Sequence, residues 1–128
     1  MKLLLDTHVV LWATIMPERL SAKAAVLMSD PGHQLVFSAV NIWEVAVKAN
    51  LGRNDFDVDP RVLRRCLLDN GYEELPVSGH HAIYVRDLPA HHKDPFDRIL
   101  VAQAMSEGIM LLTADAILAR YPAPVTLV

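Results

Sequence analysis

Short apolar runs alternate along the chain with longer stretches that begin at helix-capping residues and end near glycine or proline. Apolar runs of this length, bounded by turn residues, are typical of strands buried on both faces of a sheet. The stretches between them are long enough to form helices. The pattern predicts strands at 2–6, 34–38, 72–77, 109–113 and 125–128, and helices at 7–14, 22–30, 39–52, 59–71, 79–88, 95–108 and 114–121.

Several predicted helices carry a capping signal at their ends. Ser21, Ser38 and Ser78 each stand directly before a helix, where a hydroxyl oxygen accepts a hydrogen bond from a free backbone amide. Asp94 is followed by a proline at the first helical position, and Gly52 is a C-terminal cap. Because strands and helices alternate throughout, the sequence predicts an α/β fold with a parallel sheet of four to five strands covered by helices on both faces.

The composition narrows the class of protein. A chain of 128 residues with 52% hydrophobic residues can bury a core of its own, so we expect residues 1–128 to form a single domain. Cys66 is the only cysteine, which excludes an internal disulfide and favours the cytoplasm. No apolar stretch is long enough to span a membrane, so we expect no membrane partner.

Four acidic residues fall where a parallel sheet would bring them together. Asp6 ends the first predicted strand, and Asp115 lies two residues beyond the fourth. Glu44 is in the helix after the second strand, and Asp97 is in the first turn of the helix that begins at Pro95. Ligands bind where the carboxyl ends of parallel strands meet. We therefore expect one acidic cluster at that edge.

Each of these acids also has a structural interpretation. Glu44 stands four residues before Lys48 and could form an ion pair on a solvated helix face. Asp97 could complement the helix dipole, and Asp115 could cap a short helix. Asp94 is interpreted as a cap, so replacing it with asparagine should change little. The four acids together are more specific than any one of them.

Carboxylates this close together cannot all remain ionised unless a cation joins them. Oxygen ligands favour Mg²⁺ or Mn²⁺, and such an ion can activate water and stabilise a phosphoryl centre under attack. The sequence therefore predicts that Asp6, Glu44, Asp97 and Asp115 form a metal site, with Asp6 and Asp97 as its main ligands. Four of the 15 acidic residues would then be offset by metal, so the net charge of −3 does not exclude a nucleic-acid substrate.

Four segments resemble the sequence blocks of the PIN-domain family, and in particular its VapC-type ribonuclease toxins of bacterial type II toxin–antitoxin systems: LLLDTHVVLW, SAVNIWEVAVKANLG, HHKDPFDRILVAQA and LLTAD. The resemblance implies a three-layer α/β/α sandwich and a metal-dependent endoribonuclease. It places Asp6, Glu44, Asp97 and Asp115 at the family's acidic positions. It also matches small hydroxyl residues that support these acids, namely Thr7, Ser38 and Thr113. An RNA substrate, a cognate antitoxin protein and a homodimer are further implications.

Other residues are weaker candidates. His92 lies two residues before Asp94 and could contact substrate. Arg98 directly follows Asp97 and could bind a phosphate, although it could equally form a surface ion pair. Trp12 and Trp43 are better explained as core or interface aromatics than as surfaces for base stacking. Two alternative functions stay open: a DNA-directed PIN-type nuclease, and a non-catalytic metal-binding interaction domain of the same fold.

The sequence also carries more apolar helical residues than one short sheet needs. We expect them to line a groove for an antitoxin segment and to support dimerisation. They are Leu11, Trp12, Val26, Leu27, Met28, Leu67 and Leu68.

Overall fold

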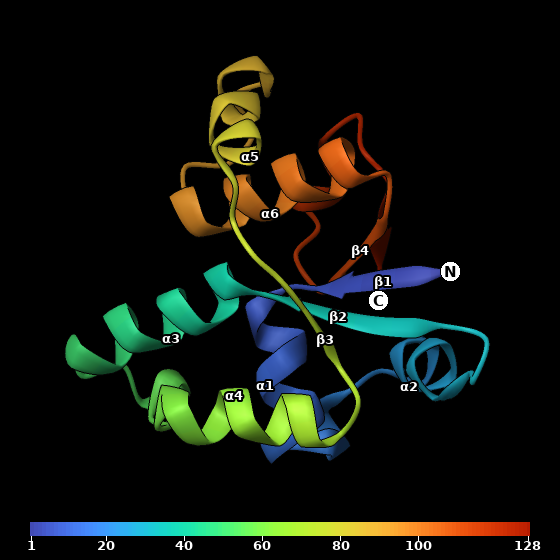
Figure 1. Ribbon diagram of the computed structural model, residues 1–128, viewed down its shortest axis with the longest axis vertical. Coiled ribbons are helices and arrows are strands. Elements are labelled where there is room, and N and C mark those ends of the chain that lie inside the picture. Colours follow the sequence, from blue (N-terminus) through green and yellow to red (C-terminus); the bar gives the residue numbers. More distant parts are fainter.

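The computed structural model describes residues 1–54 and 56–128, and within these residues it contains one sheet of five parallel strands (Figure 1). The order across the sheet is β3-β2-β1-β4-β5. The sheet thus confirms the predicted parallel arrangement, with β1 at its centre. The strands are β1 (Lys2–Leu5), β2 (Gln34–Ser38), β3 (Glu73–Leu75), β4 (Met110–Thr113) and β5 (Val125–Leu127).

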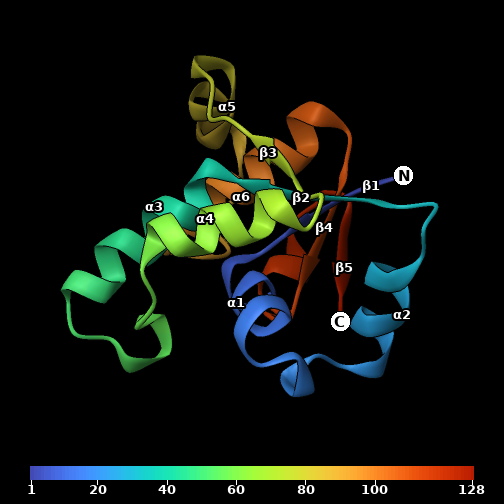
Figure 2. The same cartoon turned by 60° about the horizontal axis from the view of Figure 1, so that its bottom comes forward.

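Helices cover both faces of the sheet. Figures 1 and 2 place α5 on one side of the sheet, and α1 and α2 on the other. The predicted three-layer α/β/α sandwich is therefore confirmed. The helices are α1 (Thr7–Ile15), α2 (Ala22–Ser29), α3 (Ala39–Asn50), α4 (Pro60–Asp69), α5 (Gly79–Tyr84) and α6 (Pro95–Glu107).

The core is divided between the two faces by the alternation of side chains along each strand. Leu4 of β1 packs with α6 in one cluster, whereas Leu3 and Leu5 pack with α1 and α4 in the other. Helix α3 contributes to both clusters, with Val40 in the first and Val45 in the second. This position brings the middle of α3 to the carboxyl end of the sheet, where the acidic residues lie.

The predicted caps are present at the helix starts. The side chains of Ser21, Ser38 and Ser78 accept hydrogen bonds from the amides of the first turns of α2, α3 and α5. Asp94 caps α6 in the same way. Helix α3 ends at Asn50, and Gly52 follows with a φ of 75°, a left-handed conformation that glycine adopts without strain.

Two expected elements are shorter or different in the structure. The stretch 114–121 contains the 3₁₀ helix Leu118–Arg120 rather than an α-helix. Here the Asp115 carboxylate accepts a hydrogen bond from the amide of Ile117, which fixes a turn in place of a helical start. The helix predicted at 79–88 ends at Tyr84 and continues as the 3₁₀ helix Val85–Asp87.

The prediction that apolar residues of α1, α2 and α4 line a groove is wrong for several of them, because they are packed in the core. Leu11 and Leu67 are core residues, 3% and 0% exposed, and Leu27 and Met28 pack against the same core cluster. Two others, Val26 and Leu68, are exposed. Residue spacing could not reveal this, because α1 and α4 both cover the same face of the sheet and bury their apolar sides there.

Among the described residues, no helix combines the length and apolar composition needed to cross a membrane.

Candidate active site

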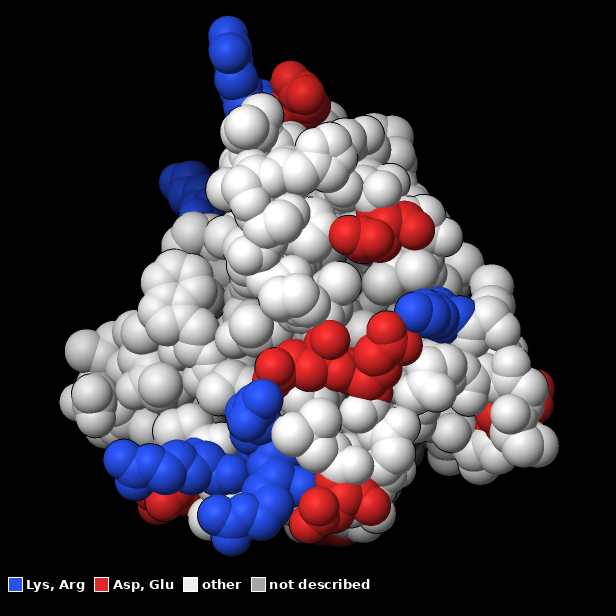
Figure 3. Space-filling view, viewed as in Figure 1, with Lys and Arg blue, Asp and Glu red and all other residues white. Residues whose placement is uncertain are grey.

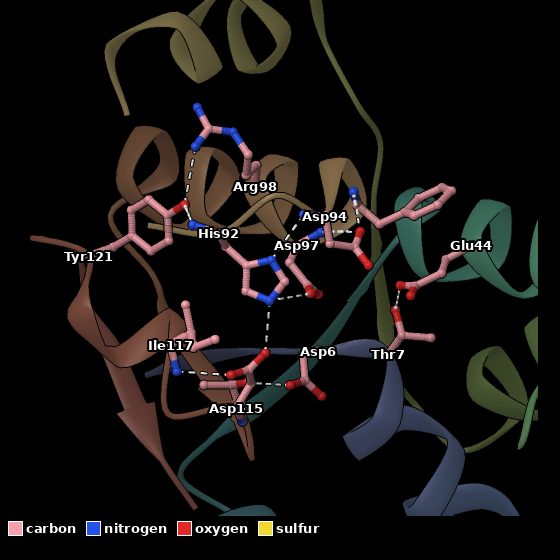
Figure 4. A network of polar contacts seen from close by, with 12 residues as sticks. Asp6, Thr7, Glu44, His92, Asp94, Asp97, Arg98, Asp115, Ile117 and Tyr121 are labelled. Carbon is pink, nitrogen blue, oxygen red and sulfur yellow. Dashed lines mark hydrogen bonds and ion pairs between the residues drawn. The ribbon is translucent and has the colours of Figure 1, made fainter. Parts of the chain in front are cut away.

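The predicted site lies where the central strands end. Asp6 follows β1 and caps α1, and Thr113 ends the neighbouring strand β4. Asp97 comes from the first turn of α6, and Glu44 comes from α3. Figure 4 shows the side chains of Asp6, Asp97 and Glu44 approaching one region from the end of β1, from α6 and from α3. The fold therefore brings acidic residues from distant parts of the chain to this edge of the sheet, as expected.

Asp6 is 5% exposed and fully engaged within the protein. Its Oδ1 accepts a hydrogen bond of 2.9 Å from the amide of Val9, and its Oδ2 accepts one from the hydroxyl of Thr113. Burial raises the pKa of Asp6, although the hydrogen bonds from Thr113 and Val9 oppose that rise. Thr113 also accepts a 3.0 Å hydrogen bond from the amide of Asp115, so one hydroxyl connects both strand-end acids.

Glu44 is 2% exposed, and both of its carboxylate oxygens have partners. The hydroxyl of Thr7 donates to Oε1 at 2.5 Å, and the ammonium of Lys48 lies 2.6 Å from Oε2. Lys48 also contacts Asp94 Oδ2 at 3.3 Å. Burial opposes protonation of Lys48, but Glu44 and Asp94 together raise the pKa of Lys48. The Glu44–Lys48 pair predicted from spacing is therefore present, but it is buried in the site rather than solvated.

The pKa of Asp97 is strongly raised from its ordinary value of 3.8. Burial is the largest cause, and the carboxylates of Asp94, Glu44 and Asp6 add to it. Only His92 opposes the shift, and the pKa of Asp97 reaches about 7. A carboxyl group in this state is poised to release its proton when a cation arrives.

His92 is more central than its sequence context indicates. Its Nε2 lies 2.9 Å from Asp115 Oδ2 and 3.4 Å from Asp97 Oδ2 (Figure 4). Within the described residues, His92, Asp97 and Asp115 form a group of potential metal ligands, with one atom from each within 4.8 Å of the others. Asp6 and Glu44 lie outside that group.

Two predicted residues have clear structural roles here. Ser38 caps α3 by accepting a hydrogen bond from the amide of Val40 at 3.0 Å. Arg98 donates to the carbonyls of Pro89 and Val85 and to the hydroxyl of Tyr121. Figure 4 shows the Arg98 guanidinium turned towards Tyr121 rather than towards the carboxylates. Arg98 therefore holds the chain that precedes α6.

Asn41 is a contributor that sequence reasoning did not single out. Its amide donates to the hydroxyl of Thr7 at 3.0 Å and to the carbonyl of Leu5 at 3.3 Å. Its carbonyl accepts from the amide of Ser38, which completes a capping box. The available signal was its position three residues after Ser38, where a capping box places a polar side chain.

The basic residues of α4 lie on another part of the surface. Arg64 forms two hydrogen bonds with Glu74 of β3, at 2.6 and 3.1 Å. Figure 3 shows acidic side chains across the middle of this face with basic side chains beside them. The charge of Arg64 is therefore balanced locally.

Comparisons with known proteins agree with this geometry. The PIN-domain family model matches residues 3–124. Ribonuclease VapC22 of Mycobacterium tuberculosis (strain ATCC 25618 / H37Rv) is 29% identical over 126 residues, which cover 96% of this chain and 95% of that protein.

Solved structures with the same fold include VapBC complexes. VapBC2 from Rickettsia felis, bound to a DNA fragment from its promoter, matches with a TM-score of 0.74 at 14% identity, covering 100% of this chain and 99% of that one. DNA-bound VapBC from Salmonella typhimurium matches with a TM-score of 0.68 at 15% identity, covering 98% and 97%. Since the family model spans nearly the whole sequence and the fold agrees with it, this chain belongs to the PIN-domain family.

Proposed function

We propose that this chain is a Mg²⁺- or Mn²⁺-dependent endoribonuclease that acts as the toxin of a bacterial toxin–antitoxin pair. The observation that carries the proposal is the meeting of Asp6, Glu44, Asp97 and Asp115 at one edge of the sheet, with the pKa of Asp97 raised to about 7. The similarity to Ribonuclease VapC22 supports RNA as the substrate. Residues 1–128 act in this proposal as a single PIN-like nuclease domain in the cytoplasm.

The donor set of the cluster fits a hard divalent cation. Asp97 and Asp115 supply carboxylate oxygens. The hydroxyl of Thr113 connects Asp6 to Asp115, because it donates to the Asp6 carboxylate and accepts a hydrogen bond from the amide of Asp115. Carboxylates suit Mg²⁺ and Mn²⁺, and the nearby imidazole of His92 is compatible with Mn²⁺. When bound, such an ion supplies Lewis acidity at the phosphoryl group and lowers the pKa of the attacking water.

The protein's own residues prepare this chemistry. Asp6 and Asp97 would be the main ligands of the ion and Asp115 a further one, while the imidazole of His92 lies between the carboxylates of Asp97 and Asp115. Thr113 fixes the orientation of Asp6. Glu44 completes the acidic cluster and helps to orient water, and Lys48 balances its charge.

Cleavage of a labelled single-stranded RNA tests the proposal directly. We expect cleavage with Mg²⁺ and with Mn²⁺, none with EDTA, and a loss of at least about 100-fold in Asp6→Asn and Asp97→Asn, because asparagine keeps the shape but removes the ligand charge. Asp87→Asn is the matched control, since Asp87 is exposed in the 3₁₀ helix Val85–Asp87. Cleavage in EDTA, or full activity in Asp97→Asn, would overturn the mechanism.

The same assay separates the alternatives. A DNA oligonucleotide of the same sequence, cleaved in place of the RNA, would identify a DNA-directed nuclease. Mn²⁺ binding measured by calorimetry, without cleavage of either polymer, would identify a non-catalytic metal-binding domain.

An antitoxin protein is the proposed partner, and a groove between α3 and α4 is the surface we assign to it. The groove has a volume of about 490 Å³, and Trp43 beside it is 51% exposed. An amphipathic or extended antitoxin segment would cover this apolar surface. Its lining comprises Ala39, Ile42, Trp43, Ala46, Pro60, Arg61, Arg64 and Glu74.

Co-expression with the adjacent small reading frame tests this partner, and light scattering tests the proposed homodimer. We expect a stable complex that Trp43→Gln weakens and that Ile83→Gln, on exposed α5, leaves intact. A monomer at all concentrations that forms no complex would contradict both assignments.

A further inference from the structure

A second groove, of about 390 Å³, opens directly beside the acidic cluster. Asp6 and Asp115 of the acidic cluster belong to its lining, and so does Arg19. The rest is contributed mainly by α1. The lining residues are Asp6, His8, Leu11, Trp12, Met16, Arg19, Ala114 and Asp115.

An aromatic and a cationic side chain are paired in this groove. The guanidinium carbon of Arg19 lies 5.4 Å from the centroid of the Trp12 ring, within the range of a cation–π contact. Arg19 reaches this position because the 3₁₀ helix Pro17–Arg19 turns back immediately after α1. Trp12 is only partly buried, and Arg19 is exposed.

His8 extends the same face of α1. It stands four residues before Trp12, and the two rings are 5.9 Å apart at an angle of 43°. The part of α1 that lines the groove therefore runs from Asp6 at the start of the helix, past His8, to Trp12, six residues after Asp6. In the part of the chain that the structure describes, Arg19 has no carboxylate partner in an ion pair. Its charge is thus available to an anionic ligand.

We propose that this groove binds a nucleotide next to the scissile phosphate, with its base on Trp12 and its phosphate on Arg19. Single-stranded nucleic acids are bound by this combination, since every base has a face that stacks and every phosphate attracts a guanidinium. The inference rests on the proposed ribonuclease function and assigns its substrate contacts. It also replaces the sequence-based interpretation of Trp12 as a core or interface aromatic.

Tryptophan fluorescence reports on the stacking directly. The chain has two tryptophans, so Trp43→Phe leaves Trp12 as the only one, and Asp97→Asn prevents cleavage during the measurement. We expect an eight-nucleotide single-stranded RNA, added with Mg²⁺, to quench this fluorescence in a saturable way. Arg19→Gln in the same background should weaken the binding by about 5- to 50-fold. Arg86→Gln, at an exposed position outside the groove, is the matched control and should leave it unchanged.

Steady-state cleavage by the otherwise wild-type chain provides a second measurement. Arg19→Gln should raise KM by a similar factor while kcat stays within about twofold, because binding rather than chemistry is lost. Trp12→Phe should retain most of the affinity, and Trp12→Leu should lose it, with thermal melts confirming that both variants fold.

The outcomes separate this inference from the proposed function. No quenching by RNA, or equal KM values for Arg19→Gln and Arg86→Gln, would overturn the nucleotide groove even if the chain cleaves RNA. Saturable quenching that depends on Arg19 would support the groove even if the wild-type chain cleaves nothing, a result that contradicts the ribonuclease proposal alone.

Discussion

The two halves of the acidic cluster balance their negative charge in different ways. On the α3 side, Glu44 and Asp94 share the ammonium of Lys48, at 2.6 and 3.3 Å. On the α6 side, Asp97 faces the imidazole of His92 at 3.4 Å, and its pKa rises to about 7. The first half holds its own cation, whereas the second half holds Asp97, a carboxyl group whose pKa is raised by burial and by neighbouring carboxylates.

This difference indicates on which side of the cluster a bound metal ion would stabilise the folded protein most. A metal near Glu44 would have to compete with Lys48. A metal at Asp97 would instead relieve the repulsion that the carboxylates of Asp94, Glu44 and Asp6 exert on Asp97. The charge balance therefore assigns the α6 side to metal binding and the α3 side to stability. Four measurements test that division.

The largest effect should come from removing the internal cation. Lys48→Met leaves Glu44, 3% exposed at its side chain, and Asp94 without a counter-charge, so we expect the free energy of unfolding to fall by about 2–4 kcal/mol. Urea unfolding at pH 7 in EDTA measures this change. Lys2→Met is the control, because the Lys2–Glu73 pair is exposed and should contribute less than about 0.5 kcal/mol. Equal losses in the two variants would contradict the division.

The opposite sign is expected at Asp97. Its pKa is raised from 3.8 to about 7, so between these values the folded protein binds more protons than the unfolded chain and loses stability as the pH rises. Asp97→Asn removes that loss. At pH 8 and without metal, the variant should be more stable than the wild type by roughly 1–3 kcal/mol, and near pH 4 the two should be equal. Chemical unfolding at both pH values tests this, and a destabilised variant at pH 8 would refute it.

Metal affinity should depend on pH through the same group. Because Asp97 must lose its proton to bind a cation, the apparent affinity for Mn²⁺ should rise by up to about tenfold per pH unit below pH 7 and level off above it. Calorimetry in buffers of different ionisation enthalpy should detect about one proton released per ion at pH 6. In Asp97→Asn the proton release should vanish; if it persists, another group is responsible.

The smallest effect is expected at Asp94. Asparagine can still accept the 2.9 Å hydrogen bond from the amide of Phe96, so the cap on α6 survives Asp94→Asn. The variant loses the longer of the two Lys48 contacts, but it also removes a charge that repels Asp97, so we expect a net cost below about 1 kcal/mol. Asp94→Ala should cost about 1 kcal/mol more in a thermal melt, since it also removes the cap. If both variants melt together, the cap contributes nothing.

Local patterns predicted much of this fold because they depend on neighbouring residues. Ser21 and Ser78 mark helix starts through hydrogen bonds that span only three residues. The Glu44–Lys48 pair follows from the spacing of one helical turn. The prediction of a helix at 114–121 is wrong, because the side chain of Asp115 accepts a hydrogen bond from the backbone amide of Ile117 and fixes a turn there.

Contacts between distant segments were beyond the reach of spacing. Lys48 meets Asp94 across 46 positions of the chain, which turns a simple helix pair into a shared cation. His92 reaches Asp115 across 23 positions, so an unremarkable histidine becomes part of the candidate metal group. Neither contact can be predicted from the local periodicity of the sequence.

Local sequence patterns were enough to predict the α/β class, the parallel sheet and the place of Asp6 at the end of the first strand, because strand and helix patterns are set by interactions within a few residues. The packing of α3 and α6 against the sheet decided the rest. That packing placed Lys48 against the carboxylates of Glu44 and Asp94, and it left Asp97 with a pKa of about 7. It also left Trp12 only partly buried beside Arg19. These properties depend on burial and on distances between charges, and both exist only once the helices have packed on the sheet.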